Sequence, residues 1–182
     1  MSRIHLFLTF LLLLVASTGA TDILVTFGVP HESKSNVGLY WTGSPSAPRI
    51  STLKPWFGNS DTTEMLVSVI QQGTTQSEQC VPGTAFVIRS ADMTSRMRVT
   101  IGENTQNDPE RPYTLAFVNL SVEDRQGPFP LELQHSNAGY VWVDPGDVVE
   151  HVTAQNHIFT VRDKSKRAVF SVTINGTAKR EL

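Results

Sequence analysis

The feature that most constrains the fold of this sequence is a succession of short strand-forming segments, each ended by turn residues. Pro and Gly mark the turns, as at Pro82-Gly83 and Pro145-Gly146. Many short strands with such turns are typical of a β-sandwich or barrel, so we expect an all-β fold. The expected strands are Ile23–Phe27, Gly38–Trp41, Met65–Ile70, Ala85–Arg89, Arg96–Ile101, Thr114–Asn119, Pro130–Gln134, Tyr140–Val143, Ile158–Arg162 and Ala168–Ile174.

One segment is also compatible with a helix. Residues 61–64 read Asp-Thr-Thr-Glu, the pattern of a capping box, and they precede the apolar residues 65–71. The β-branched side chains of Val67, Val69 and Ile70 favour a strand at the same place. We therefore expect a strand there, with a helix as the alternative.

The sequence resembles itself at a spacing of 73 residues, which indicates an internal repeat. Upstream the spacing grows to 90, since Phe27 aligns best with Phe117, and an insertion at residues 44–62 accounts for the difference. The identical positions are Gly73, Phe86, Arg89 and residues 99–101, which fall on Gly146, Phe159, Arg162 and residues 172–174.

The repeat predicts two tandem β-sandwich domains. The first would span residues 21–106, including the loop insertion at 44–62, and the second residues 113–176. A polar linker at 107–112 would join them. The alternative is one larger sandwich whose halves are alike by chance.

Composition narrows the function classes. Of the 182 residues, 40% are hydrophobic, enough for a packed core, while the charged fraction is 18% and the net charge is −2. No basic surface for nucleic acid is expected from these values. The single cysteine, Cys80, excludes an intramolecular disulfide and a four-thiolate zinc site. Because Cys80 closely precedes an apolar strand, we expect it to be buried rather than paired with another chain.

The first twenty residues have the layout of a secretory signal peptide. Arg3 and His5 precede an apolar run, Leu6–Val15, and small residues follow at 16–20. The run is too short to span a bilayer, and no later run is longer, so no membrane span is expected. Cleavage is expected after Gly19 or Ala20.

The last four residues, Lys179, Arg180, Glu181 and Leu182, resemble the Lys-Asp-Glu-Leu retrieval signal, with Arg where Asp is usual. Together with a signal peptide, they predict the lumen of the endoplasmic reticulum and a retrieval receptor as a partner. Secretion is the alternative.

Two sequons occur, at Asn119 and Asn175. Asn175 follows the last expected strand and is the better glycosylation candidate. Asn119 lies at the end of an expected strand.

No catalytic motif is evident. The sequence has no Gly-x-Ser-x-Gly elbow and no phosphate-binding glycine loop. The four histidines after the signal peptide, His31, His135, His151 and His157, form no His-x-Asp or His-x-x-x-His metal pair. We expect a binding protein with no enzymatic activity, no metal and no cofactor. An enzyme with an unrecognised site and an assembly subunit without a ligand pocket are the alternatives.

A set of residues in the second half resembles the β domain of the von Hippel–Lindau tumour-suppressor family. That family has Tyr, then Pro-Gly, Ser, His-x-aromatic and Arg-Asp in the same order and spacing, and a Phe-x-Asn-x-Ser strand upstream. The resemblance covers about residues 113–174, with a degenerate copy in 22–102. The matching positions are Tyr140, Pro145-Gly146, Thr153, His157, Phe159, Arg162-Asp163 and Phe117–Ser121.

The resemblance implies a pocket for a 4-hydroxyproline side chain. Its residues would be Tyr140, Thr153, His157 and Phe159, with Thr in place of the family's Ser and Phe in place of its Trp. An aromatic wall would pack on the pyrrolidine ring, while a hydroxyl and an imidazole nitrogen would bond the ligand's hydroxyl group. We therefore expect a lumenal recognition module that binds a protein or peptide client of the secretory pathway, specifically a prolyl-hydroxylated one.

The first half lacks these residues. It carries Val67, Cys80, Thr84 and Phe86 at the matching positions, without the Tyr and the imidazole. The first half is therefore not expected to bind the same ligand.

Overall fold

The computed structural model describes residues 22–43, 64–92, 95–106, 108–121, 130–136 and 139–178. Over these ranges the chain forms strands and turns but no helix. The expected signal peptide, the loop insertion at 44–62 and the tail at 179–182 lie outside the described residues.

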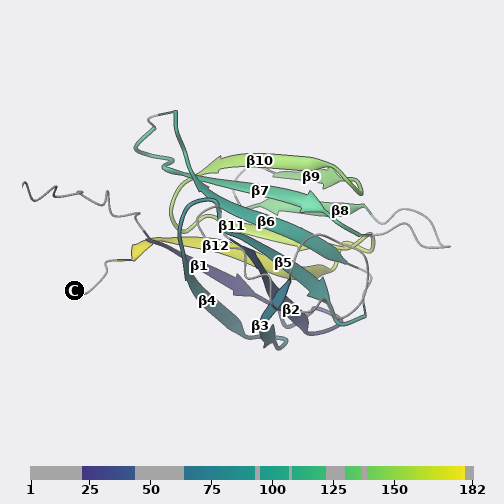
Figure 1. Ribbon diagram of the computed structural model, residues 1–182. Coiled ribbons are helices and arrows are strands. Elements are labelled where there is room, and N and C mark those ends of the chain that lie inside the picture. Colours follow the sequence, from purple (N-terminus) through teal and green to yellow (C-terminus); the bar gives the residue numbers. More distant parts are fainter. Residues whose placement is uncertain are drawn as a thin grey trace, which may run out of the picture.

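Twelve strands form two antiparallel sheets of six (Figure 1). In sheet A the order is β4-β1-β12-β11-β8-β9, and in sheet B it is β10-β7-β6-β5-β2-β3. The expectation of an all-β fold is confirmed. The strands are β1 (Asp22–Gly28), β2 (Val37–Gly43), β3 (Met65–Ile70), β4 (Thr75–Cys80), β5 (Ala85–Ser90), β6 (Arg96–Glu103), β7 (Tyr113–Asn119), β8 (Leu131–His135), β9 (Gly139–Val143), β10 (Val148–Thr153), β11 (Ile158–Arg162) and β12 (Ala168–Ala178).

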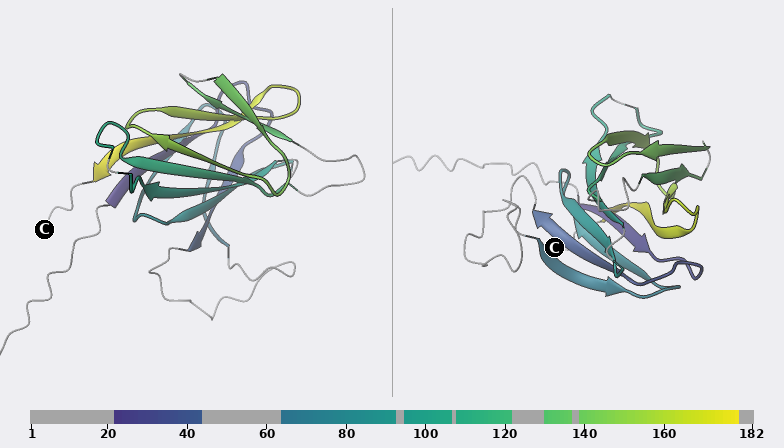
Figure 2. Two further views of the ribbon diagram at one scale, coloured as in Figure 1. Left: turned by 90° about the horizontal axis from the view of Figure 1, so that it is seen from above. Right: turned by 90° about the vertical axis from the view of Figure 1, so that its right-hand side faces the viewer.

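The expected division into two separate sandwiches does not match the strand pairing. Each sheet takes four strands from one half of the chain and two from the other. β1 pairs with β12, and β6 pairs with β7, over seven residue pairs in each ladder. The start of β1 therefore lies beside the end of β12 (Figure 2). The described strands form the single larger sandwich, because hydrogen bonds between the halves complete both sheets.

The internal repeat is nevertheless visible in the topology. Each strand of the first repeat has an equivalent in the second whose number is higher by six, so that β1 corresponds to β7 and β6 to β12. When every strand is exchanged for its equivalent, the strand order of sheet A becomes that of sheet B. The registers agree as well: Phe27 pairs with Val172, and its repeat equivalent Phe117 pairs with Val99. The two repeats, β1–β6 and β7–β12, are thus interlocked by a pseudo-twofold relation.

Two strands were missed by the sequence reasoning, and they are equivalents of each other. β4 lies at one edge of sheet A and β10 at one edge of sheet B, and each adjoins a strand of its own repeat. β4 alternates exposed with half-buried residues, so most of its sequence is polar. Because an edge strand needs few apolar side chains, β4 lacks the alternation of apolar and polar residues from which a strand is predicted. The alternative helix at residues 65–71 does not form, since residues 65–70 are β3.

Two equivalent turns bring each edge strand back toward the sandwich. Gly83 and Asn156 occupy the left-handed region, with φ of 86° and 64°, which glycine and asparagine adopt most readily. The amide of Gly83 donates to Ile101 O at 2.6 Å, and the amide of Asn156 donates to Ile174 O at 2.7 Å. Each turn is therefore hydrogen-bonded to the final strand of its own repeat, β6 or β12.

One hydrophobic core fills the space between the sheets, and it includes buried residues of both repeats. Phe27 of β1 packs on Phe86 of β5, with ring centroids 5.1 Å apart. The equivalent pair, Phe117 of β7 and Phe159 of β11, has centroids 5.5 Å apart. Each pair joins sheet A to sheet B, so the two aromatic contacts hold the layers together.

Because the core is shared, Phe86→Ala and Phe159→Ala should each lower the free energy of unfolding of the whole molecule. We expect a loss of about 3–5 kcal/mol for each variant, from lost burial and the cavity left behind. Denaturant unfolding followed by far-ultraviolet circular dichroism measures this. One transition is expected for the wild type and for both variants. Two separable transitions, with only one shifted by each variant, would contradict a shared core.

Candidate functional site

Three of the four residues expected to form the ligand pocket come together in the second repeat. Thr153 ends β10, His157 follows the tight turn, and Phe159 lies in β11. Thr153 Oγ1 and His157 Nδ1 are 3.2 Å apart and hydrogen-bonded. Thr153 and Phe159 are each 1% exposed, so their side chains belong to the interior, while His157 is half-buried.

Sequence reasoning missed two further histidines at this place. His135 Nε2 lies 3.2 Å from His157 Nδ1, and the His135 ring packs on Phe159 with centroids 4.6 Å apart. His151 of β10 packs on Phe159 from the opposite sheet, at 5.3 Å. We call His135, His151 and His157 the histidine cluster. It lies at the end of the sandwich where β9 and β10 are the outermost strands (Figure 1).

Tyr140 does not join these residues. Along β9, Val143 belongs to the core, so alternation places Tyr140 and Trp142 on the outer face of sheet A. Tyr140 is 61% exposed, and its ring lies beneath the Lys166 ammonium, 5.6 Å from the ring centroid. The four predicted residues therefore divide between the two faces of sheet A: three on the inner side and Tyr140 on the outer side.

Burial favours the neutral form of His135 and His151. Burial lowers the pKa of His135, and the neighbouring His157 and His151 lower it further. Burial alone lowers the pKa of His151, whose buried Nε2 has no hydrogen-bond partner within the described residues. Neutral imidazoles can pack against Phe159 without the cost of desolvating a charge.

Within the described residues, the hydrogen-bond contacts of His157 involve only one of its two ring nitrogens. Both of its hydrogen-bond contacts, to Thr153 and to His135, use Nδ1. The two contacts fix the ring orientation, and Nε2 is the nitrogen that they leave available. A neutral imidazole either donates or accepts at Nε2, according to which tautomer the contacts at Nδ1 select.

The first repeat has a different set at the equivalent positions. By strand register, Trp41 corresponds to His135, Glu78 to His151 and Thr84 to His157. The cluster is therefore a property of the second repeat alone, as expected for a site that the symmetry of the fold does not require.

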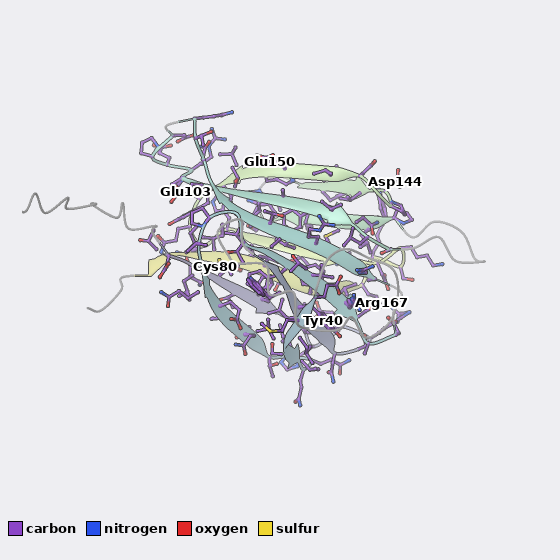
Figure 3. All side chains as sticks on the ribbon, viewed as in Figure 1. Tyr40, Cys80, Glu103, Asp144, Glu150 and Arg167 are labelled. Atoms are coloured by element: carbon purple, nitrogen blue, oxygen red, sulfur yellow. The ribbon has the colours of Figure 1, made fainter. Side chains whose placement is uncertain are left out.

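Cys80, the equivalent of Thr153, is buried and its thiol is free. Figure 3 labels this residue. Its thiol is 3.5 Å from Ile23 O, and burial raises its pKa to about 12, with Asp22 and Glu78 adding to the effect. The expectation that Cys80 is buried is confirmed. Such a thiol is unreactive at neutral pH because the thiolate is scarcely populated.

The two sequons lie in different surroundings. Asn119 is 0% exposed; its Nδ2 donates to Val143 O at 2.8 Å and its Oδ1 accepts from the Ser121 amide at 2.9 Å. β12 extends through Asn175, which corrects the expectation that this residue follows the last strand. Asn175 Oδ1 accepts from Thr26 Oγ1 at 2.6 Å. Glycosylation of either residue stays a prediction.

Across the described ranges, no group of three or more His, Cys, Asp or Glu side chains is arranged to hold a metal ion. In the same part of the chain, no helix is long and apolar enough to cross a membrane.

Comparison with known proteins does not place the chain in a family. No family model matches it, and neither the curated proteins nor the solved structures give a match. The resemblance to the von Hippel–Lindau β domain stays a prediction from residue spacing.

The histidine cluster predicts a loss of stability in acid. Since folding lowers the pKa of His135 and His151, the unfolded chain binds protons more readily than the folded one below the ordinary histidine pKa. The free energy of unfolding should therefore fall as the pH is lowered from about 7 to about 5. His151→Phe, which keeps an aromatic ring but cannot titrate, should make this fall shallower. Thermal unfolding across the pH range measures it.

His31 provides the matched control, because it is exposed in the turn after β1. The pH dependence of stability should be shallower for His151→Phe than for His31→Phe. Identical pH profiles for His151→Phe and the wild type would contradict a pKa of His151 that burial lowers.

Proposed function

We propose that this protein is a non-enzymatic recognition module of the endoplasmic reticulum lumen that binds prolyl-hydroxylated peptide at the histidine cluster. The observation that carries the proposal is the fixed, half-buried ring of His157, held at Nδ1 by Thr153 and His135. A ring held in this way keeps Nε2 for a hydrogen bond to a ligand hydroxyl.

The energy of such a contact favours discrimination rather than tight binding. A hydrogen bond to a ligand hydroxyl contributes about 0.5–1.5 kcal/mol net. An unhydroxylated proline would leave the imidazole unpaired, at a cost of about 1–3 kcal/mol. The spacing of Thr153, His157 and Phe159 supports 4-hydroxyproline as the source of the hydroxyl.

The edge strands support a peptide rather than a small free ligand. β9 and β10 flank the cluster, and each is an outermost strand among those described. Backbone groups along an outermost strand can pair with an extended chain. The signal-like start and the Lys179–Leu182 tail support the lumen, where such a client would be met.

A second candidate is an assembly subunit that uses β3. Met65, Leu66 and Val69 are exposed along this outermost strand of sheet B. Exposed apolar side chains on a free strand edge favour contact with another chain. Co-purification of one partner at fixed stoichiometry, lost in Leu66→Asp, would favour this candidate.

The recognition proposal is tested by titration calorimetry with matched peptides that differ only in hydroxylation of one proline. We expect the hydroxylated peptide to bind about 5- to 150-fold more tightly, the range that 1–3 kcal/mol gives. His157→Ala should remove most of this preference because it removes Nε2. His31→Ala, at an exposed histidine, should keep it. Equal binding of both peptides by the wild type would contradict the proposal.

A further inference from the structure

The outer face of sheet A carries two exposed aromatic side chains on one strand. Tyr140 and Trp142 of β9 are 61% and 42% exposed. Residues two apart on a strand share a face and are separated by about 7 Å. The two rings therefore stand side by side on the outermost strand of the sheet, where a ligand can approach them from solvent.

Polar side chains continue both rows across the sheet. On β8, Glu132 is opposite Trp142 and Gln134 is opposite Tyr140. On β11, Arg162 is the register partner of Glu132. Arg162 Nε donates to Gln134 Oε1 at 2.9 Å, and its Nη1 donates to Lys166 O at 2.9 Å. Hydrogen-bond donors and acceptors of β8 and β11 therefore lie next to the two aromatic rings, on the same face of sheet A.

Glu132 is unusual within this array. It is 4% exposed, although it lies on the outer face of the sheet. Its Oε1 is 4.0 Å from Arg162 Nε, and its buried Oε2 has no hydrogen-bond partner within the described residues. A buried carboxylate oxygen left without a donor is destabilising, so it favours a ligand that supplies one.

The first repeat shows that the fold does not need this arrangement. Arg89, the equivalent of Arg162, is hydrogen-bonded to Glu64, which also binds Arg96. Gly38 stands in place of Glu132, and Val69 in place of Trp142. Ion pairs therefore satisfy the Glu64 carboxylate there, whereas the equivalent face of sheet A keeps both its aromatic rings and an unsatisfied acceptor.

We propose that this face, formed by Tyr140, Trp142, Glu132, Gln134 and Arg162, binds a neutral pyranose ring of a carbohydrate. A pyranose has an apolar C–H face that can stack on the aromatic rings and a rim of hydroxyl groups that donate and accept. A hydroxyl group of this rim is the kind of donor that Glu132 Oε2 lacks within the described residues. Gln134 and Arg162 bond the neighbouring hydroxyls.

Charge favours a neutral ligand over a cationic one. Two cationic side chains, Arg162 and Lys166, lie at the face beside the Glu132 carboxylate. The ammonium of Lys166 already lies over the Tyr140 ring. A lysine or arginine side chain from a partner would meet this positive charge, while a sugar ring would not. The site lies on the opposite side of sheet A from the histidine cluster and goes beyond the proposed peptide binding.

The test is saturation-transfer NMR on the full chain with the methyl glycosides of glucose, mannose, galactose and N-acetylglucosamine. At least one glycoside should receive saturation, and Trp142→Ala should weaken its binding by about tenfold or more. Val69→Ala, at the equivalent position of the first repeat, should leave binding unchanged. No transfer to any of the four glycosides, or equal transfer with Trp142→Ala, would overturn the proposal.

Two further variants guard against a folding defect. Tyr140→Ala should also weaken binding, and Glu132→Gln, which keeps the shape of the side chain, should weaken it while the unfolding midpoint is retained. Sugar binding should be unchanged in His157→Ala. Failure of the sugar proposal can therefore be distinguished from failure of the peptide proposal. If an oligolysine peptide received saturation and none of the glycosides did, the face would bind cations, and the sugar proposal would be overturned.

Discussion

The pairing of strands between the two repeats is the constraint on which the rest of this structure depends. β1 pairs with β12, and β7 pairs with β6, so each sheet is made of strands from both halves of the chain. The Phe27–Phe86 and Phe117–Phe159 contacts then join the two layers at equivalent places. A repeat by itself would leave unpaired the strand edges of β1 and β6, or of β7 and β12, that the other repeat completes.

Comparing the two repeats distinguishes residues that the fold requires from residues that belong to one candidate site. The scaffold uses the same registers, turns and aromatic contacts twice, whereas the histidine cluster and the outer face of sheet A occur once. Trp41 and Glu78 stand where the second repeat has His135 and His151. Positions that differ between the two repeats are therefore ones that the fold does not constrain, and they are candidates for functional residues. Both candidate sites lie in the second repeat.

The sequence predicted the strand content and the repeat, but not how the repeats combine. Residues 99–101 and 172–174 are both Val-Thr-Ile, so β1 meets the same three side chains whether it pairs with β6 or with β12. Local sequence cannot distinguish these pairings. Half of β10 is valine (Val148, Val149 and Val152), but these residues do not alternate regularly with polar ones, so the strand and the place of His151 opposite Phe159 are not evident from the sequence. Tyr140 was assigned to the pocket by spacing alone, which does not say on which face of β9 it lies.

The central claim, that the repeats exchange strands, is tested most directly by nuclear Overhauser contacts across the ladders. The structure pairs Thr26 with Thr173 and Ala116 with Thr100. Two tandem sandwiches with the same repeat register would instead pair Thr26 with Thr100 and Ala116 with Thr173. Backbone contacts of the first kind in the isotope-labelled full chain are the predicted result. Contacts of the second kind would contradict the interlocked fold.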